Sequence, residues 1–147
     1  MTREISSRTV TLGRESEGVY IATNAKGDQL RFGRGEGLLS PVELLLAAIA
    51  GCSSIDVDVM TSRRSEPERF DVTASADYVT EDGANILENI QVLFDLAFPE
   101  GAEGDAARKR IAAALRSSHE RSCTVSRTVE AGVPVALVEA GADAVTA

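Results

Sequence analysis

The chain has few of the residues that cross-link small proteins or bind metals, because only two cysteines and one histidine occur among its 147 residues. Its longest uncharged apolar run, residues 44–52, covers nine residues, whereas a membrane-spanning helix needs about 20. The N-terminal segment MTREISSRTV contains no apolar signal segment. We therefore expect a cytoplasmic protein without a membrane partner. In that compartment two cysteines are buried small hydrophobes or redox-active thiols rather than a permanent disulfide.

Positive charge is also scarce. The chain carries 15 Lys and Arg residues against 23 Asp and Glu residues, which gives a formal net charge of −8. Nucleic acids and anionic membrane surfaces bind to basic protein faces, so neither is an expected partner.

The single histidine leaves little room for a metal site. His119 stands four residues before Cys123, a spacing that can place two metal ligands on one helix face. A closed site would also need Cys52 and a carboxylate from elsewhere in the chain. We therefore expect His119 at the surface or at an interface, and we expect no metal and no other cofactor.

What the chain does contain is typical of one globular domain. Hydrophobic residues make up 44% of the sequence, and a chain of this length buries roughly 70% of its unfolded surface. We place the domain at residues 1–139 and expect residues 140–147 to be a frayed tail.

Apolar alternation and turn residues predict three short antiparallel strands at the N-terminus and three further strands later in the chain. In the fourth of these, every second residue from Phe70 to Tyr78 is expected to share one face. Pro134 indicates that the last strand lies at a sheet edge. The expected strands are residues 6–12, 18–23, 29–33, 69–78, 89–98 and 133–139.

The segment SPVELLLAAIAGC, residues 40–52, predicts a helix from Pro41 to about Thr61. Ser40 is a favourable N-cap, and Glu43 completes a capping box with it. From residue 44 to residue 51 the helix is apolar on every face. In a soluble protein such a helix lies inside the fold or between two subunits.

Two more helices are expected, over residues 104–120 and 121–132. The second follows a Ser122 N-cap and carries Cys123 in its first turn, where the helix dipole and free N–H groups favour a thiolate. Cys52 borders the apolar helix, where a thiol is inert unless a cation stabilises its thiolate. The order β-β-β-α-β-β-α-α-β is an α+β fold, without the alternation that builds a doubly wound sheet.

Each cysteine lies in a distinctive segment: SPVELLLAAIAGCSSIDV at 40–57 and SSHERSCTVSRTVE at 117–130. Together these segments resemble the OsmC/Ohr family of osmotically inducible and organic-hydroperoxide-resistance proteins. The resemblance covers essentially the whole chain, including the order of its elements. It implies a domain-swapped homodimer, in which a central buried helix from each chain is wrapped by sheet from both chains. Such a dimer would account for a helix that is apolar on every face.

The resemblance also implies a role for each thiol. Cys52 corresponds to the peroxidatic cysteine, whose thiolate attacks the O–O bond of a hydroperoxide. Cys123 corresponds to the cysteine that resolves the resulting sulfenic acid to a disulfide. The implied partners are a small organic hydroperoxide and a dithiol reductant of unknown identity.

In the peroxidase members an arginine from the N-terminal strands and a glutamate near the start of the central helix hold the first thiol as thiolate. Arg14 best fits the family's glycine–arginine turn. Its rivals are Arg8, Arg31 and Arg34.

The glutamate is matched less well. In the clearest peroxidases it directly follows the proline, but that position is Val42 here and the acid is Glu43. Nine residues separate Glu43 from Cys52, which corresponds to a helical rotation of about 180°. Glu43 therefore fits the capping box better than a contact with the thiol of its own chain.

Two functions from different classes follow. The first is a cysteine-based peroxidase that reduces organic hydroperoxides in oxidative stress defence. The second is a non-enzymatic dimeric scaffold that binds a small apolar molecule, a function favoured by Val42 and by the unassigned arginine. Titration would separate them, because one thiol that ionises below about pH 7.5 favours catalysis and two thiols near about 8.5 favour a scaffold.

Overall fold

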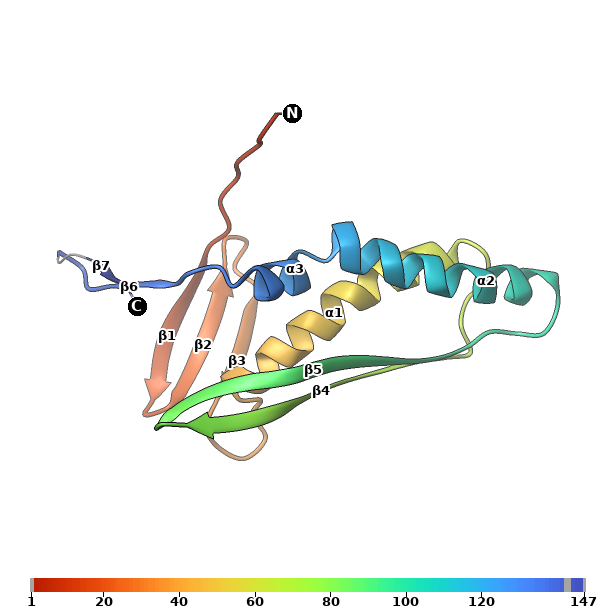
Figure 1. Ribbon diagram of the computed structural model, residues 1–147. Coiled ribbons are helices and arrows are strands. Elements are labelled where there is room, and N and C mark those ends of the chain that lie inside the picture. The colour runs from red at the N-terminus through yellow and green to blue at the C-terminus, as the bar shows by residue number, and fades with distance from the viewer. Residues whose placement is uncertain (1, 142–143, 147) are drawn as a thin grey trace. The chain divides into compact units, whose positions relative to one another are not determined.

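The computed structural model describes residues 2–141 and 144–146 and confirms an α+β fold (Figure 1). The chain forms two compact units, Met1–Leu45 and Leu46–Ala147, and each is described by itself. The single domain over residues 1–139 stays a prediction. The elements are β1 (Val10–Ser16), β2 (Val19–Asn24), β3 (Gln29–Gly33), α1 (Pro41–Ser62), β4 (Arg69–Glu81), β5 (Ala84–Ala97), α2 (Ala102–Ser117), η1 (Ser118–Ser122), α3 (Thr124–Ala131), β6 (Ala136–Val138) and β7 (Ala144–Thr146).

The first unit contains a three-stranded antiparallel sheet in the order β1-β2-β3. β1 lies four residues later than its predicted position at 6–12. A tight turn causes the difference, because Ser16 pairs with Val19 and the turn at Gly18 adopts a positive φ of 75°. This turn fixes the register and extends β1 to Ser16. The predictions for the next two strands are confirmed within one residue.

The capping box predicted at the start of α1 is confirmed. The Ser40 amide donates to Glu43 Oε1 at 3.0 Å, and the Glu43 amide donates to Ser40 Oγ at 3.2 Å. Hydrogen bonds from the Ser40 backbone and then from its side chain hold the pKa of Glu43 below its usual value. The helix begins at Pro41 and ends at Ser62, one residue beyond the predicted end.

Over an 18-residue window, α1 is long and apolar enough to cross a membrane by length and composition alone. Core helices of soluble proteins have the same composition, and here the helix belongs to a small α+β fold. Only 17% of that window is buried within this chain. Ile55 is 67% exposed and Val59 is 49% exposed. Much of the apolar surface of α1 is therefore uncovered in one chain.

β4 and β5 form a long antiparallel hairpin (Figure 1). Its turn consists of Asp82 and Gly83, which both adopt positive φ angles, 51° and 77°. Two such residues suit the tight hairpin turns that match the twist of the strands. On β5 the predicted alternation is confirmed, since Ile90, Val92 and Phe94 are half-buried and the residues between them are exposed.

A β-bulge interrupts the pairing of β4 with β5. Ser75 pairs with Gln91 but Asp77 pairs with Glu88, so the extra residue lies in β5, where Asn89 adopts a positive φ of 51°. Up to Ala76 the half-buried residues alternate as predicted. Beyond the bulge the alternation reverses, so Tyr78 is 60% exposed and Val79 is half-buried. Phe70 is half-buried, so Tyr78 is more exposed than the predicted alternation implies.

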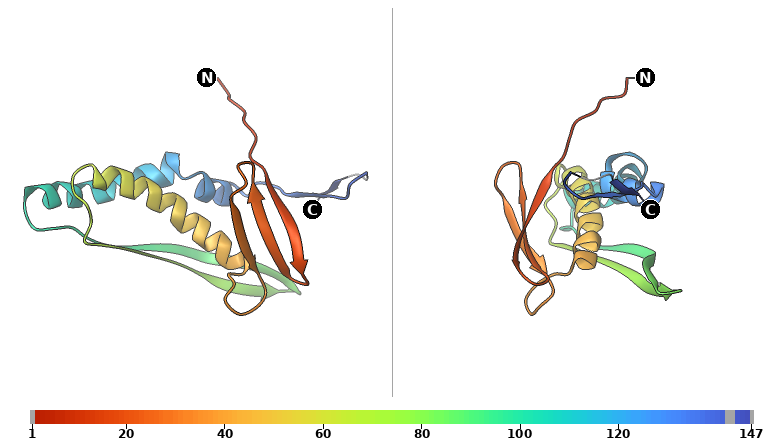
Figure 2. Two further views of the ribbon diagram at one scale, coloured as in Figure 1. Left: turned by 180° about the vertical axis from the view of Figure 1, so that it is seen from behind. Right: turned by 90° about the vertical axis from the view of Figure 1, so that its left-hand side faces the viewer.

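The predicted helix over 104–120 is two segments, the α-helix α2 and the short π-helix η1. The second half of α1 lies beside α2 in both directions of view (Figure 2), and Arg64 and Arg110 line one surface hollow there. Gly104, in the first turn of α2, packs directly on the backbone carbonyl of Pro99, and a Cβ atom would overlap that carbonyl.

The N-cap of α3 lies one residue later than predicted. The N-cap is Cys123, with an extended backbone (φ −76°, ψ 90°), whereas Ser122 still belongs to η1. An N-cap needs such non-helical angles, so the cysteine occupies the position expected for Ser122. The helix ends before Gly132, which adopts left-handed angles (φ 61°, ψ 44°).

β6 pairs with β7 as a short antiparallel hairpin. The strand predicted at 133–139 is reduced to Ala136–Val138, since Pro134 has no N–H for a strand ladder. Within the segment predicted to be a frayed tail, Ala144–Thr146 form β7. Residues 142–143 and 147 of that segment lie outside the described part of the chain.

Candidate functional site

The second unit brings the two cysteines together. Cys52 lies on α1 and is half-buried, whereas Cys123 lies at the start of α3 and is fully buried. The Cys52 side chain lies near enough to the Cys123 thiol to lower its pKa, although the two residues are far apart in the sequence. Both thiols are free. The structure therefore places two reduced sulfurs beside each other at the contact between α1 and α3.

The π-helix η1 positions Cys123. The wider turn of η1 ends with the Cys123 amide donating to the Ser118 carbonyl at 2.8 Å. Ser118 is itself buried, and its Oγ donates to Asp56 Oδ2 on α1 at 2.8 Å. The backbone that carries Cys123 is thus hydrogen-bonded to α1 one helical turn beyond Cys52.

Two serines surround the sulfur of Cys123. The Ser53 hydroxyl, on α1, donates to Cys123 Sγ at 3.4 Å. The Ser126 amide donates to the same sulfur at 3.4 Å, and the Cys123 thiol lies 3.0 Å from Ser126 Oγ, to which it donates. When the thiol ionises, the freely rotating Ser126 hydroxyl can donate to the thiolate instead.

These contacts decide the ionisation of Cys123. Burial is the largest single influence and raises its pKa, because the charged form loses water. Hydrogen bonds from the Ser126 side chain, from Ser53 and from the Ser126 amide act in the opposite direction, as does the Cys52 side chain. Together they outweigh burial and hold the pKa of Cys123 below its ordinary value. The prediction that the helix start favours a thiolate at Cys123 therefore agrees with its surroundings.

A cavity of about 380 Å³ adjoins this cluster. Its walls come from α1, β5, the helices α2 and α3, and η1. The apolar lining residues are Ile49, Ile90, Val92, Phe94, Leu115 and Val129, and the polar ones are Ser53, Ser118, His119, Ser126 and Glu130. Ser53 and Ser126 thus face both the cavity and the sulfur of Cys123. The cavity can hold an apolar group on the far side of these two serines from the Cys123 sulfur.

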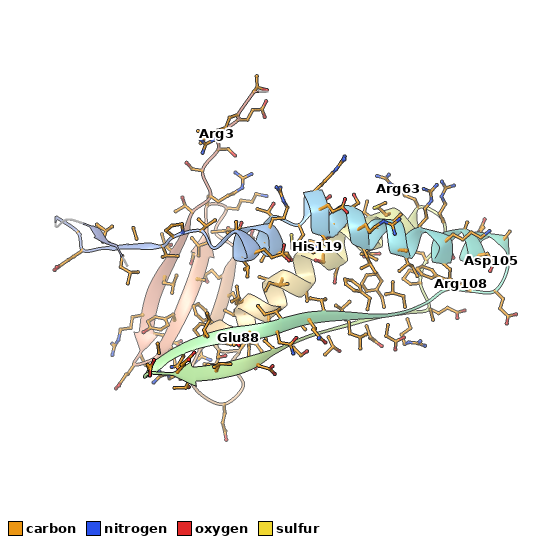
Figure 3. All side chains as sticks on the ribbon, viewed as in Figure 1. Arg3, Arg63, Glu88, Asp105, Arg108 and His119 are labelled. Carbon is orange, nitrogen blue, oxygen red and sulfur yellow. The ribbon has the colours of Figure 1, made fainter. Side chains whose placement is uncertain are left out.

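His119 borders the cavity from η1 (Figure 3). Its Nε2 lies 2.9 Å from Glu130 Oε1 on α3, and both side chains are more than half exposed. In the sequence, His119 and Cys123 have a spacing that can place two metal ligands on one helix face. The structure instead pairs His119 with Glu130, across the junction that holds Cys123.

The family model described as OsmC-like protein matches residues 33–138. The chain belongs to the OsmC-like family. The match includes both cysteines of this OsmC-like protein and every element from α1 to β6. The resemblance that the two cysteine segments carry is thereby confirmed. No curated protein matches the sequence.

Solved structures show the same fold at low sequence identity. A hypothetical protein from Aquifex aeolicus VF5 is 23% identical with a TM-score of 0.68, over 88% of this chain and 91% of that chain. An OsmC-like protein of unknown function from Vibrio cholerae is 13% identical with a TM-score of 0.66, over 86% and 95%. An OsmC-like hydroperoxide resistance protein from Jannaschia sp. CCS1 is 16% identical with a TM-score of 0.50, over 88% of each chain.

The other two predicted site residues belong to the first unit. Arg14 lies on β1 opposite Tyr20, and Glu43 is exposed in the capping box. Their roles at Cys52 stay predictions. Among the rival arginines, Arg31 forms an ion pair with Glu15 at 2.7 Å, so its guanidinium already has a carboxylate partner.

Sequence reasoning missed the polar residues that hold Cys123. Ser126 could have been found, because the side chain of an N-cap residue accepts from the amide three positions later, and Ser126 is that position once Cys123 is taken as the N-cap. Ser53 and the Asp56–Ser118 pair leave no local signal, since they join segments more than 60 residues apart.

Proposed function

We propose that this OsmC-like protein is a cysteine-based peroxidase that reduces organic hydroperoxides. The observation that carries the proposal is the pair of free thiols beside an apolar cavity. Membership of the OsmC-like family supports it, as does the fold shared with a protein named for hydroperoxide resistance. A dithiol reductant of the kind present in the cytoplasm would regenerate the thiols.

The chemistry has two steps. The Cys52 thiolate attacks one peroxide oxygen, so an S–O bond forms and the O–O bond breaks. The alkoxide leaves as an alcohol after it takes a proton, and Cys52 becomes a sulfenic acid. The Cys123 thiolate then attacks the sulfur of Cys52, an S–S bond forms, and the hydroxyl leaves as water. Overall, one hydroperoxide and two thiols give an alcohol, water and a disulfide.

In the proposed order, Cys52, whose sulfur is the more exposed of the two, reacts with the peroxide first. Cys52 is half-buried and Cys123 is fully buried, so Cys52 is the more accessible of the two thiols. Cys123 has the hydrogen bonds that favour a thiolate, and the second step needs a thiolate that attacks from within the protein. Arg14 is our proposed partner for the Cys52 thiolate.

We further propose that the active form is a homodimer. The exposed apolar surface of α1, which includes Ile55 and Val59, is the argument for a second copy. A central helix covered by the partner would bury the residues that one chain leaves in water.

The cavity leads us to expect a preference for alkyl hydroperoxides over hydrogen peroxide. An alkyl tail gains about 25 cal/mol for each Å² of apolar surface buried, so four methylenes are worth roughly 3 kcal/mol. Peroxide consumption with a dithiol reductant should favour cumene or tert-butyl hydroperoxide by at least about tenfold in kcat/KM. A non-reducing peptide map after one equivalent of peroxide should contain the Cys52–Cys123 pair.

Two β5 variants test whether the cavity causes this preference. Val92→Thr places a hydroxyl in the cavity wall and should reduce the discrimination between the two peroxides. The control is Leu93→Thr, at the next position, which is 68% exposed in the chain and outside the cavity lining. Equal rates for both peroxides in the unaltered protein would remove the role of the cavity. If no peroxide is consumed and no cross-link forms, the second function, a scaffold that binds an apolar molecule in this cavity, is the better description.

A further inference from the structure

The hydrogen bonds at Cys123 involve two serines to which the two-thiol chemistry assigns no role. Ser53 follows Cys52 directly on α1, yet its hydroxyl donates to the sulfur of Cys123 rather than to that of its neighbour. Ser126 approaches the same sulfur from α3 with both its amide and its hydroxyl. Two elements of the second unit therefore each supply a hydroxyl to one buried sulfur atom.

We propose that Ser53 and Ser126 are positioning residues that hold Cys123 as the nucleophile which closes the disulfide on oxidised Cys52. The inference rests on the proposed function, because it assigns the second step of that reaction. In this step the Cys123 thiolate attacks Cys52 sulfur, the S–S bond forms and the S–O bond breaks. The leaving hydroxyl takes a proton and departs as water.

The groups that donate hydrogen bonds to the Cys123 sulfur are uncharged. A fully buried thiol without donors stays protonated and unreactive. Several charged groups on the surrounding elements are bonded elsewhere: Asp56 on α1 accepts from Ser118, His119 on η1 pairs with Glu130 on α3, and Arg127 on α3 donates to the Arg121 carbonyl. Within residues 46–141, the described hydrogen bonds to Cys123 Sγ come from Ser53 and Ser126. The two serines therefore carry most of the stabilisation of its thiolate.

The position of Ser53 also gives it a geometric role. Because it neighbours Cys52 on α1 and contacts Cys123, its hydrogen bond holds the start of α3 against the turn of α1 that bears the first thiol. The backbone bond from Cys123 to Ser118, and the bond from Ser118 to Asp56, hold the same junction from the η1 side. The sulfur of Cys123 is thus kept beside Cys52 before any oxidation occurs.

This arrangement decides the fate of the sulfenic acid. A sulfenic acid that meets a second peroxide molecule becomes a sulfinic acid, which dithiols do not reduce. Rapid attack by Cys123 prevents that loss. Removal of either hydroxyl should therefore shift the products from disulfide towards Cys52 sulfinic acid, in proportion to the slower second step.

The second step can be measured without peroxide. An aromatic disulfide such as Ellman's reagent forms a mixed disulfide with the more exposed Cys52 and releases one thionitrobenzoate. The Cys123 thiolate then attacks Cys52 sulfur and releases a second thionitrobenzoate as the internal disulfide closes. In Ser53→Ala and Ser126→Ala, the second release should slow by about tenfold, because a hydrogen bond to a charged group is worth about that factor or more.

Matched variants separate this role from a structural one. Ser54→Ala removes the next hydroxyl on α1, which makes no described contact with Cys123 Sγ, and it should leave the second release unchanged. Ser53→Thr and Ser126→Thr keep a hydroxyl and should restore most of the rate. In a Cys52→Ser background, titration of Cys123 should shift to higher pH in the Ser126→Ala protein and return towards the starting midpoint in Ser126→Thr.

The outcomes distinguish this inference from the proposed function. An unchanged second release and an unchanged Cys123 titration in both alanine variants would overturn the role of the serines, whatever the peroxidase activity. Slower release that the threonine variants rescue would support it. If that rescue is seen and no hydroperoxide is consumed by the unaltered protein, the peroxidase proposal fails while the assignment of the serines to disulfide closure stands.

Discussion

Cys123 combines two properties that usually exclude each other, complete burial and hydrogen bonds that favour its charged form. Burial alone would make it an inert core thiol. Ser53 and Ser126 change that outcome, because each presents a hydroxyl to the sulfur. At the scale of single residues, we therefore expect these two serines to make the difference between an inert and a reactive Cys123.

The more acidic thiol need not be the one oxidised first. We predict that Cys52 reacts first, because it is the more exposed of the two and Cys123 is sealed in the protein. A sulfenic-acid trapping reagent, applied to Cys123→Ser after substoichiometric cumene hydroperoxide, should label Cys52. The reciprocal variant Cys52→Ser is the control, and labelling of Cys123 there at equal speed would reverse the assignment.

At the scale of elements, α2 depends on one glycine at its start. Gly104 packs on the carbonyl of Pro99, and Arg108 on the next turn donates to the carbonyl of Phe98 at 2.9 Å and pairs with Asp105 (Figure 3). The loop after β5 is thus bound against the first turns of α2. Any side chain at position 104 must push this loop away.

We predict that Gly104→Ala destabilises the protein by about 1–3 kcal/mol, the usual cost of overpacking. In an open helix the same substitution would be stabilising, since alanine favours helix more than glycine does. Urea unfolding followed by circular dichroism measures the change. The control Glu103→Ala, at the adjacent exposed position, should stay within about 0.5 kcal/mol, and equal stability of both variants would contradict the close packing at Pro99.

The sequence predicted those elements whose signals are local. The start of α1 follows from Ser40 and Glu43, which lie within one helical turn and form the predicted capping box. The half-buried face of β5 follows from its alternation up to Leu96. Both features depend on residues a few positions apart, so a single sequence contains the whole signal.

Other features depend on contacts that no local pattern records. Tyr78 is more exposed than the alternation of β4 predicts, and nothing in the sequence pattern marks the extra residue in β5. The π-turn of η1 moves the start of α3 to Cys123, so the predicted Ser122 cap was wrong. The prediction that Cys52 and Cys123 lie close together came from the family resemblance and not from a local pattern. The contact of Ser53 with Cys123 joins residues 70 positions apart.

At the scale of the whole molecule, the exposed apolar face of α1 predicts an obligate homodimer. A folded chain with Ile55 and Val59 in water would lose hydrophobic stabilisation that a second copy can supply. An intertwined interface should exceed about 2,000 Å². Sedimentation equilibrium at low micromolar concentration should therefore give twice the chain mass, and a folded monomer there would refute the dimer.

Redox state should also change the stability of the whole molecule. A disulfide between Cys52 and Cys123 would close a long loop in the unfolded chain, which stabilises the folded state by about 4 kcal/mol in the chain-entropy model. For a chain of this size we expect Tm to rise by about 10 °C on oxidation. Calorimetry with and without dithiol measures the shift. Cys123→Ser should show none, and a wild-type Tm that is insensitive to dithiol would indicate that the bond does not form.

The sulfur of Cys123 is also the cap of α3, since it accepts from the Ser126 amide. On the proposed chemistry, that sulfur becomes half of a neutral disulfide, which is a poor acceptor, and the first turn of α3 loses its anchor. α3 supplies Val129 and Glu130 to the cavity wall. In the proposed order the alcohol forms in the first step, so disulfide closure in the second step would remove the cap of a helix that lines the cavity after the alcohol has formed.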